Sequence, residues 1–248
     1  MSLPRKIRCV VDSIADHGER VYTVELAPEG PVPTFRPGQF LHLSVDDYDP
    51  SGFWPESRVF SIASSPRERS RIRICYSVKG RYTTKMEQVL QPGGKVWIKL
   101  PYGDFVIDEE RDATLIAGGT GISAFTAFID ALTPGYPRAV TLLYGARTPA
   151  LLLFQDRILS QAGQVPGFEV VLFCETSDGH VPDCPVASTR QPIRHIGLIE
   201  LGLACRRGRW GAGEIFYLSG PPSMLRAMGA ELQARGIDAD RIRTDAWE

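Results

Sequence analysis

Residues 113–124 read Ala-Thr-Leu-Ile-Ala-Gly-Gly-Thr-Gly-Ile-Ser-Ala, an apolar run followed by a glycine-rich turn and the start of a helical pattern. Gly119–Ala124 fits the pattern G-x-G-x-x-A between a predicted strand, Ala113–Ala117, and a predicted helix, Ile122–Leu132. Glycines at such a turn allow a ligand to approach the backbone closely, and the N-terminus of a helix favours anionic phosphate. The same pattern also occurs as an ordinary turn between a strand and a helix, so the motif alone leaves nucleotide binding open.

The sequence downstream of this turn alternates between strand-like and helix-like segments. Further strands are predicted at Ala139–Tyr144, Phe168–Phe173 and Ile215–Leu218, a last one at Arg241–Thr244, and helices at Leu151–Leu159 and Ser223–Ala234. This alternation predicts a parallel, Rossmann-like sheet with crossover helices. The second strand is followed by Gly145-Ala146-Arg147, without the acidic residue that commonly binds a ribose.

The sequence upstream of the turn has a different pattern, in which short runs alternate between apolar and polar residues. These predicted strands are Ile7–Ile14, Val21–Leu26, Phe40–Val45, Ile72–Val78 and Lys95–Leu100. Turn residues such as Pro37-Gly38 separate them, Arg58–Ser61 is also predicted as a turn, and only Thr83–Leu90 is predicted as a helix. Several short strands at this spacing predict an antiparallel barrel. The pattern changes in the charged stretch Asp108–Asp112, so we expect two domains, 1–108 and 109–248.

Composition narrows the functional classes. The 248 residues carry a formal net charge of −1, which argues against a nucleic-acid surface, and no apolar run approaches the length of a membrane span. The first residues contain no apolar signal region, which predicts a cytoplasmic location. The five cysteines show neither C-x2-C nor C-x4-C-x2-C spacing, and the four histidines show no metal-ligand spacing. The sequence therefore predicts no metal site.

Six motifs in fixed order point to a family. In the first half, Arg58-x-Phe60-Ser61 is followed by Pro66, preceded by Arg36–Phe40, and followed further on by Gly80-x-x-Thr83. The second half adds Gly118–Gly121, Tyr144–Arg147 and Ser219-Gly220-Pro221-Pro222-x-Met224. Together these motifs resemble the ferredoxin–NADP reductase family over nearly the whole chain. The resemblance implies a flavin-binding antiparallel barrel followed by a nicotinamide-binding parallel-sheet domain.

The resemblance also implies roles for the barrel residues. Arg58 would pair with flavin phosphate, Phe60 would pack on the isoalloxazine ring where the family usually has Tyr, and Ser61 would lie beside the flavin N5 atom. Gly80 and Thr83 would meet the phosphates at a helix start. The cofactor-binding set on this half is completed by Val59, Tyr76, Val78 and Thr84. FAD is the expected flavin, with FMN less favoured.

In the second half, the resemblance places Thr120 and Ser219 beside the nicotinamide, and Ser219 stands where the family usually has Cys. Trp247 would cover the flavin, as a terminal aromatic does in several family members. Ser61, Thr120, Ser219 and Trp247 are thus the expected catalytic residues. The dinucleotide would also contact Gly118, Gly119, Gly121, Arg147, Gly220, Pro221 and Met224.

The choice of nicotinamide cofactor stays open. Arg147, at the end of a predicted strand, could accept the 2′-phosphate of NADPH, whereas the acidic loop Cys174–Gly179 favours NADH. The sequence thus predicts a flavoprotein oxidoreductase that takes a hydride from NADH or NADPH and passes electrons to a protein, such as a ferredoxin or an oxygenase component, or to a small acceptor. Two alternatives remain: an electron-transfer subunit active only within a larger complex, and a non-redox binding module on the same fold.

Overall fold

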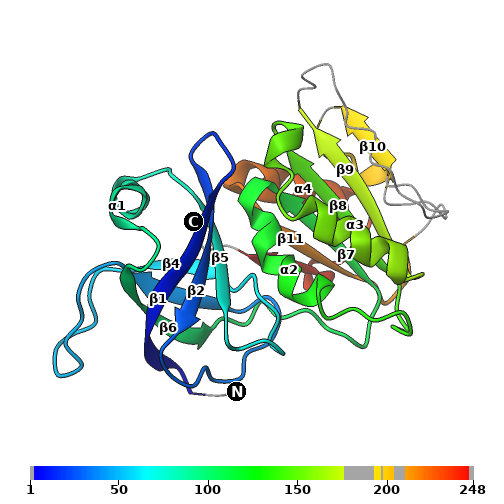
Figure 1. Cartoon of the computed structure of the whole chain (residues 1–248). Coiled ribbons are helices and arrows are strands. Elements are labelled where there is room, and N and C mark those ends of the chain that lie inside the picture. The colour runs from blue at the N-terminus through cyan, green and yellow to red at the C-terminus, as the bar shows by residue number, and fades with distance from the viewer. Residues whose placement is uncertain (1–2, 176–192, 197, 204–209, 246–248) are drawn as a thin grey trace. The chain divides into compact units, whose positions relative to one another are not determined.

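The computed structural model describes residues 3–175, 193–196, 198–203 and 210–245 (Figure 1). Contacts between Cα atoms divide the chain into two compact units. The first unit comprises residues 1–106 and 123–128, and the second comprises 107–122 and 129–248. The domain ranges 1–108 and 109–248 stay a prediction.

The first unit contains a nearly closed antiparallel barrel, as expected. Its six described strands are ordered β4-β3-β6-β1-β2-β5. The N–H of Ala63 donates to the carbonyl oxygen of Arg73 (2.9 Å), which joins the segment after β4 to β5 and brings the two edges of the sheet together. The strand bounds are β1 Arg5–Asp16, β2 Val21–Pro28, β3 Phe40–Ser44, β4 Arg58–Ser61, β5 Ile72–Ser77 and β6 Lys95–Tyr102.

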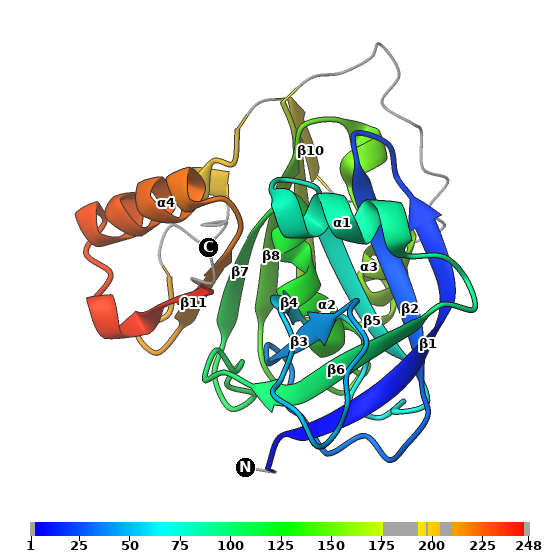
Figure 2. The ribbon, with the colours of Figure 1, turned by 90° about the vertical axis from the view of Figure 1, so that its left-hand side faces the viewer.

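Side-chain alternation builds the barrel core. In β1, Ile7, Cys9 and Val11 are buried, Lys6 and Arg8 are exposed and Val10 is half-buried, which is the period of two that the sequence shows. Similar inward residues of the other strands join them in one apolar cluster, which includes Met86 and Tyr82 of helix α1, Arg81–Val89. Packing of these two side chains fixes α1 on the barrel (Figure 2).

The second unit contains a parallel sheet. Within the described residues its strand order is β10-β9-β8-β7-β11-β12, and every pair is parallel. The bounds are β7 Ala113–Gly118, β8 Val140–Ala146, β9 Phe168–Cys174, β10 Ile193–Ile196, β11 Ile215–Ser219 and β12 Ile242–Asp245. All six residues of β7 are buried, because central strands of parallel sheets are covered on both faces.

Helices α3, Gln155–Gln164, and α4, Pro222–Ala234, lie on opposite faces of this sheet (Figure 2). Leu232 of α4 packs into one apolar cluster with Ile116 of β7 and Leu218 of β11. Helix α2, Ser123–Ile129, follows the glycine-rich turn and is divided between the units, since residues 123–128 cluster with the barrel. The predicted fold class, a barrel followed by a parallel α/β sheet, is confirmed.

Two local predictions differ from the structure, and one strand was not predicted. Arg58–Ser61 is strand β4 rather than a turn, because its residues pair in register with Phe40–Leu43 of β3. The helix predicted at Leu151–Leu159 begins only at Gln155, since Phe154 adopts a left-handed conformation (φ +59°) after a short 3₁₀ turn at Pro149–Leu151. Strand β10 is the one that the sequence did not predict.

Candidate cofactor sites

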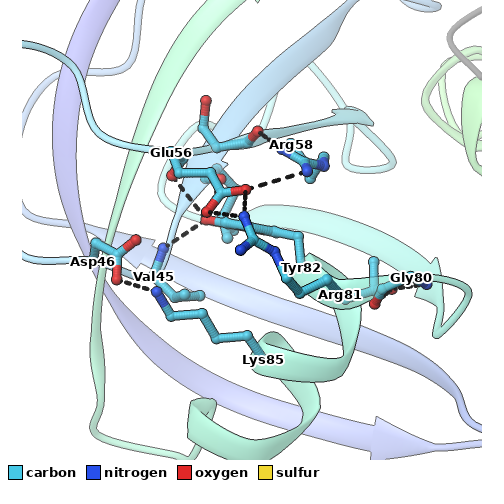
Figure 3. A network of polar contacts seen from close by, with 11 residues as sticks. Val45, Asp46, Glu56, Arg58, Gly80, Arg81, Tyr82 and Lys85 are labelled. Carbon is cyan, nitrogen blue, oxygen red and sulfur yellow. Dashed lines mark hydrogen bonds and ion pairs between the residues drawn. The ribbon is translucent and has the colours of Figure 1, made fainter.

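The first candidate site is a cluster of charged side chains on the barrel. Arg58, at the start of β4, donates from Nη2 to Oε1 of Glu56 (3.3 Å) and from Nη1 to the carbonyl oxygen of Ser57 (2.8 Å). Its guanidinium also lies over the ring of Tyr82, with Cζ 4.9 Å from the ring centroid. The same carboxylate of Glu56 receives Arg81 of α1, from Nη2 to Oε1 at 3.2 Å (Figure 3). Two guanidiniums therefore share one carboxylate.

Tyr82 is the anchor of this cluster. Its side chain is buried, and its hydroxyl oxygen accepts the N–H of Val45 (3.1 Å) while lying 3.2 Å and 3.1 Å from the carbonyl oxygens of Leu43 and Glu56. Burial raises the pKa of Tyr82, so the hydroxyl stays protonated at neutral pH. The hydroxyl thereby ties the start of α1 to the end of β3 and to the residue two positions before Arg58.

Gly80 and Thr83 form the N-terminus of α1. The Thr83 hydroxyl accepts the N–H of Gly80 (3.1 Å) and that of Lys79 (3.0 Å), and the N–H of Thr84 donates to the carbonyl oxygen of Gly80 (2.9 Å). Gly80 is thus the N-cap residue, and Thr83, in the third helical position, satisfies the N–H of Gly80 from within the first turn. The first N–H groups of a helix lack partners within it, and they point out of its N-terminus, where an anion can meet them.

Aromatic and hydroxyl groups lie further along the same strands. Phe60 of β4 is half-buried and packs against the barrel core, with its ring centroid 6.1 Å from that of Tyr76 in β5. Tyr76 is buried and stacks on Tyr22 of β2 at 5.3 Å. Ser61, half-buried, ends β4 opposite Phe40. Val59 and Val78 are also half-buried, and Val78 contacts the core.

The second candidate site lies where β7 and β11 end side by side. A Cβ built at Gly118 would lie 2.5 Å from Sδ of Met224, and one at Gly121 would lie 2.3 Å from the carbonyl oxygen of Ser219. A Cβ at Gly220 would lie 3.0 Å from the N atom of Gly118. The two motifs predicted for the dinucleotide therefore pack closely, backbone against backbone at Gly121 and Gly220 and against the Met224 side chain at Gly118, and a side chain at Gly121 would collide with backbone atoms.

Gly119 differs from its neighbours in this turn. It has φ +52°, and a Cβ built there would meet nothing within 4 Å. The clearance that the motif predicts for a dinucleotide is therefore available at Gly119, whereas protein atoms take the space at Gly121. Thr120 is half-exposed beside it, and Pro221 is exposed at the start of α4.

Ser219 is buried at the end of β11, where its hydroxyl donates to Oδ2 of Asp245 (3.0 Å). Parallel pairing of β11 with β12 places these two residues opposite each other. Asp245 gave no sequence signal because it is 26 residues away from its partner. A recognisable β11–β12 register is the only signal that could have found it.

Three predicted features are only partly described or lie outside the candidate sites. Arg147 is exposed just after β8, and the acidic loop Cys174–Gly179 is described only as far as Glu175. Trp247 lies outside the described residues. The contacts of Glu56, Arg81 and Tyr82 were not predicted, although Arg81 and Tyr82 fall inside the motif Gly80-x-x-Thr83.

Over the part of the chain that the structure describes, no three His, Cys, Asp or Glu side chains gather into a group that could hold a metal ion. None of the helices described has both the length and the apolar character needed to cross a membrane.

Comparisons with known proteins agree with this arrangement. Residues 115–229 match the family described as oxidoreductase NAD-binding domain. The chain is 32% identical over 225 residues to reductase component 2 of a terephthalate 1,2-dioxygenase from Comamonas sp., covering 89% of this chain and 61% of that protein. It is 27% identical over 230 residues to a flavohemoprotein of Deinococcus radiodurans, covering 91% of this chain and 55% of that protein. The chain thus spans little more than half the length of these relatives.

Solved structures show the same fold. A cytochrome P450 reductase from Amycolatopsis superposes with a TM-score of 0.77 at 24% identity, covering 98% of this chain and 70% of that one. The FAD/NAD-binding domain of a nitric oxide dioxygenase from Vibrio cholerae superposes with a TM-score of 0.74 at 21% identity, covering 96% and 97% of the two chains.

Proposed function

Because this chain belongs to the ferredoxin reductase-like family, we propose that it takes a hydride from NADH or NADPH onto a bound FAD and passes the electrons to a redox partner. The observation that carries the proposal is the Arg58 cluster at the N-terminus of α1. It gathers a guanidinium and the N–H groups of a helix start on one patch of the barrel, close to the half-buried ring of Phe60.

The side chains on the barrel fit a flavin. Guanidinium groups and helix N-termini bind phosphate, and an aromatic ring such as Phe60 can pack on an isoalloxazine. When bound, a flavin accepts two electrons and one proton as hydride from a nicotinamide and can release the electrons one at a time. The protein would contribute binding and orientation: Arg58, Gly80 and Thr83 would hold the phosphates, Val59, Tyr76 and Val78 would contact the flavin from β4, β5 and the segment after β5, and Ser61 would lie beside its hydride-accepting atom.

The turn of the second unit fits a dinucleotide. The backbone of Gly119 has no protein atom where a Cβ would lie, and Thr120 is next to it in the turn. Ser219 lies where the glycine-rich turn packs against the motif at residues 219–224. The single O–H of Ser219 is donated to Asp245 (3.0 Å), so Ser219 presents acceptor lone pairs to a nicotinamide carboxamide. Arg147 is the candidate for a 2′-phosphate.

The partner is proposed from the relatives. One is the reductase component of a dioxygenase and another is a flavohemoprotein, and this chain spans 61% and 55% of their lengths. We propose a ferredoxin or an oxygenase component as the acceptor. The dioxygenase component favours the alternative in which the chain acts as a subunit of a larger complex.

The test is the absorbance spectrum of the purified protein after incubation with FAD and removal of unbound FAD, followed by anaerobic titration with NADH and NADPH in parallel. We expect a yellow protein that is bleached by at least one of them. A protein that stays colourless after FAD is added would indicate a non-redox module. A yellow protein that neither nucleotide bleaches would contradict the proposed dinucleotide site.

Trp247 stays a proposed cover for the flavin. Aromatic stacking beyond area burial contributes about 0.5–1.5 kcal/mol. Trp247→Ala should therefore raise the fluorescence of the bound flavin and lower the KM for the nicotinamide by about 2- to 12-fold. Unchanged fluorescence and KM would remove Trp247 from the site.

A further inference from the structure

Arg81 shares the carboxylate of Glu56 with Arg58. The Nη2 atom of Arg81 lies 3.2 Å from Oε1 and 3.4 Å from Oε2 of Glu56, and Nη2 of Arg58 lies 3.3 Å from the same Oε1. Arg58 comes from β4 and Arg81 from the first position of α1, so two elements bring their guanidiniums to one point (Figure 3). Neighbouring cations repel, and the shared carboxylate offsets that repulsion.

The structure holds these two guanidiniums in a fixed relation. Arg58 stacks on Tyr82, and the hydroxyl of Tyr82 lies 3.1 Å from the carbonyl oxygen of Glu56. Arg81 immediately precedes Tyr82 in α1. The buried ring of Tyr82, whose placement depends on the barrel core, therefore positions Arg58 and the backbone of Glu56, and Arg81 reaches the same point through the Glu56 carboxylate.

Stability alone does not account for Arg81. Its side chain is 87% exposed, and exposed ion pairs contribute little to folding. Arg58, at 48% exposed, is also open to solvent. Both cations can accept an anion from solution without breaking a packed contact.

Resting on the proposed function, we propose that Arg58 and Arg81 together bind the diphosphate of FAD, and that Arg81 makes the chain select FAD over FMN. Arg58 binds the phosphoryl group that FAD and FMN share. Arg81 binds the second phosphoryl group, which FMN lacks. A planar guanidinium can hold two oxygens of one phosphoryl group, so a pair of them suits a ligand with two such groups. Glu56 is a positioning residue that keeps the pair together.

The test compares equilibrium binding of FAD and of FMN to the whole chain, measured by flavin fluorescence. Arg81→Gln should weaken FAD binding by about 10-fold and change FMN binding by less than about twofold. Arg81→Lys keeps the positive charge but loses the planar guanidinium that can hold two oxygens. Its affinity for FAD should lie between those of wild type and Arg81→Gln. The matched control is Arg20→Gln, because Arg20 makes an exposed ion pair with Glu87 on the same helix α1. Arg20→Gln should leave both affinities unchanged.

Any other outcome would contradict the proposal. Equal weakening of FAD and FMN would place Arg81 at the shared phosphoryl group, and unchanged FAD binding would leave it as a surface ion pair. If Arg20→Gln weakened FAD as much as Arg81→Gln, a general charge effect would replace the specific one. Wild-type protein that binds neither flavin would instead contradict the proposed function, and the Arg81 proposal would fall with it. Circular dichroism of each variant checks that it is folded.

Discussion

The two candidate sites are formed by different chemical groups, charged side chains in one and closely packed backbone in the other. On the barrel, Arg58, Glu56 and Arg81 meet through exposed, charged side chains at 3.2–3.3 Å. In the parallel-sheet unit, Gly121 meets backbone atoms of Ser219 and Gly220 at distances that leave no room for a Cβ, and Gly118 and Gly220 pack closely against the Met224 side chain. Both motifs are proposed to bind phosphate, one by side-chain charge and the other by backbone approach.

This difference predicts which property a substitution changes at each site. A charged surface cluster can lose a member with little cost to folding, since its contacts are solvent-exposed. A turn packed backbone on backbone cannot accept a larger residue without moving, since protein interiors are close-packed. Substitutions on the barrel should therefore change affinity, and substitutions in the turn should change stability and affinity together.

The largest expected effect is that of Gly121→Ala. The added Cβ would lie 2.3 Å from the carbonyl oxygen of Ser219 and 2.7 Å from the N atom of Gly220. Backbone atoms cannot move aside as a flexible side chain can, so we expect a loss of about 3 kcal/mol and a Tm lower by about 6–12 °C. Reduction by NAD(P)H should also be lost, while the barrel keeps its flavin.

The matched control is Gly229→Ala. Gly229 lies inside α4, and a Cβ there meets nothing within 4 Å. Alanine is the better helix former, so this variant should be neutral or more stable by about 0.5–1 kcal/mol. A Gly121→Ala variant as stable as wild type would show that the turn is not closely packed and would remove the contrast between the two sites.

Arg58→Ala should have the next largest effect, on affinity instead of stability. Removing a charge-assisted contact to phosphate costs about 1.5–3 kcal/mol, which is about 10- to 150-fold in the Kd for FAD. Because the Arg58 side chain is 48% exposed, Tm should hardly change. Retention of FAD after dialysis as in wild type would exclude Arg58 from the phosphate site.

The sequence predicted elements whose pattern is carried by neighbouring residues. The period of two in Ile7–Ile14 and Ile72–Val78 gave β1 and β5, because one face of each strand is buried. Strand β4 has four residues, too few for a period to show, and only its pairing with β3 reveals it. The start of α3 depends on the left-handed Phe154, an unusual conformation that no residue type announces.

The residues of the candidate sites likewise fall into two groups, those predicted by short motifs and those brought together only by the fold. Motif spacing pointed to Arg58, Thr83 and the glycines of the turn because these lie within short segments. Glu56 and Arg81 meet only when α1 docks on the barrel, 25 residues apart in the sequence. The partner of Ser219 likewise depends on the register of two parallel strands. Contacts between distant segments follow from the fold and leave no local pattern.

Ser219→Ala should have an effect of intermediate size on stability, and it tests a side-chain contact in the parallel-sheet unit. It removes the donor to the buried carboxylate of Asp245, and loss of such a hydrogen bond costs about 1–3 kcal/mol. Tm should fall by less than in Gly121→Ala, and flavin affinity should not change. Ser219→Thr, which keeps the hydroxyl, serves as the control. Equal Tm values for Ser219→Ala and wild type would contradict a structural role for this hydrogen bond.

The smallest expected effect is the pH dependence of the ion pair between Arg20 and Glu87, which tests whether exposed charges on the barrel serve folding at all. The hydrogen bond from Arg20 lowers the pKa of Glu87 below its ordinary value. A lowered pKa in the folded state means that the stabilisation is complete above the ordinary pKa, 4.5, and is lost as the pH falls through the folded value. Wild-type Tm should thus exceed that of Arg20→Gln slightly at about pH 7, and the two should converge toward about pH 3. Thermal unfolding followed by circular dichroism across this range measures the difference. A Tm difference that does not depend on pH would show that Arg20 acts through packing of its side chain, and it would make Arg20→Gln a poorer control for the charge of Arg81.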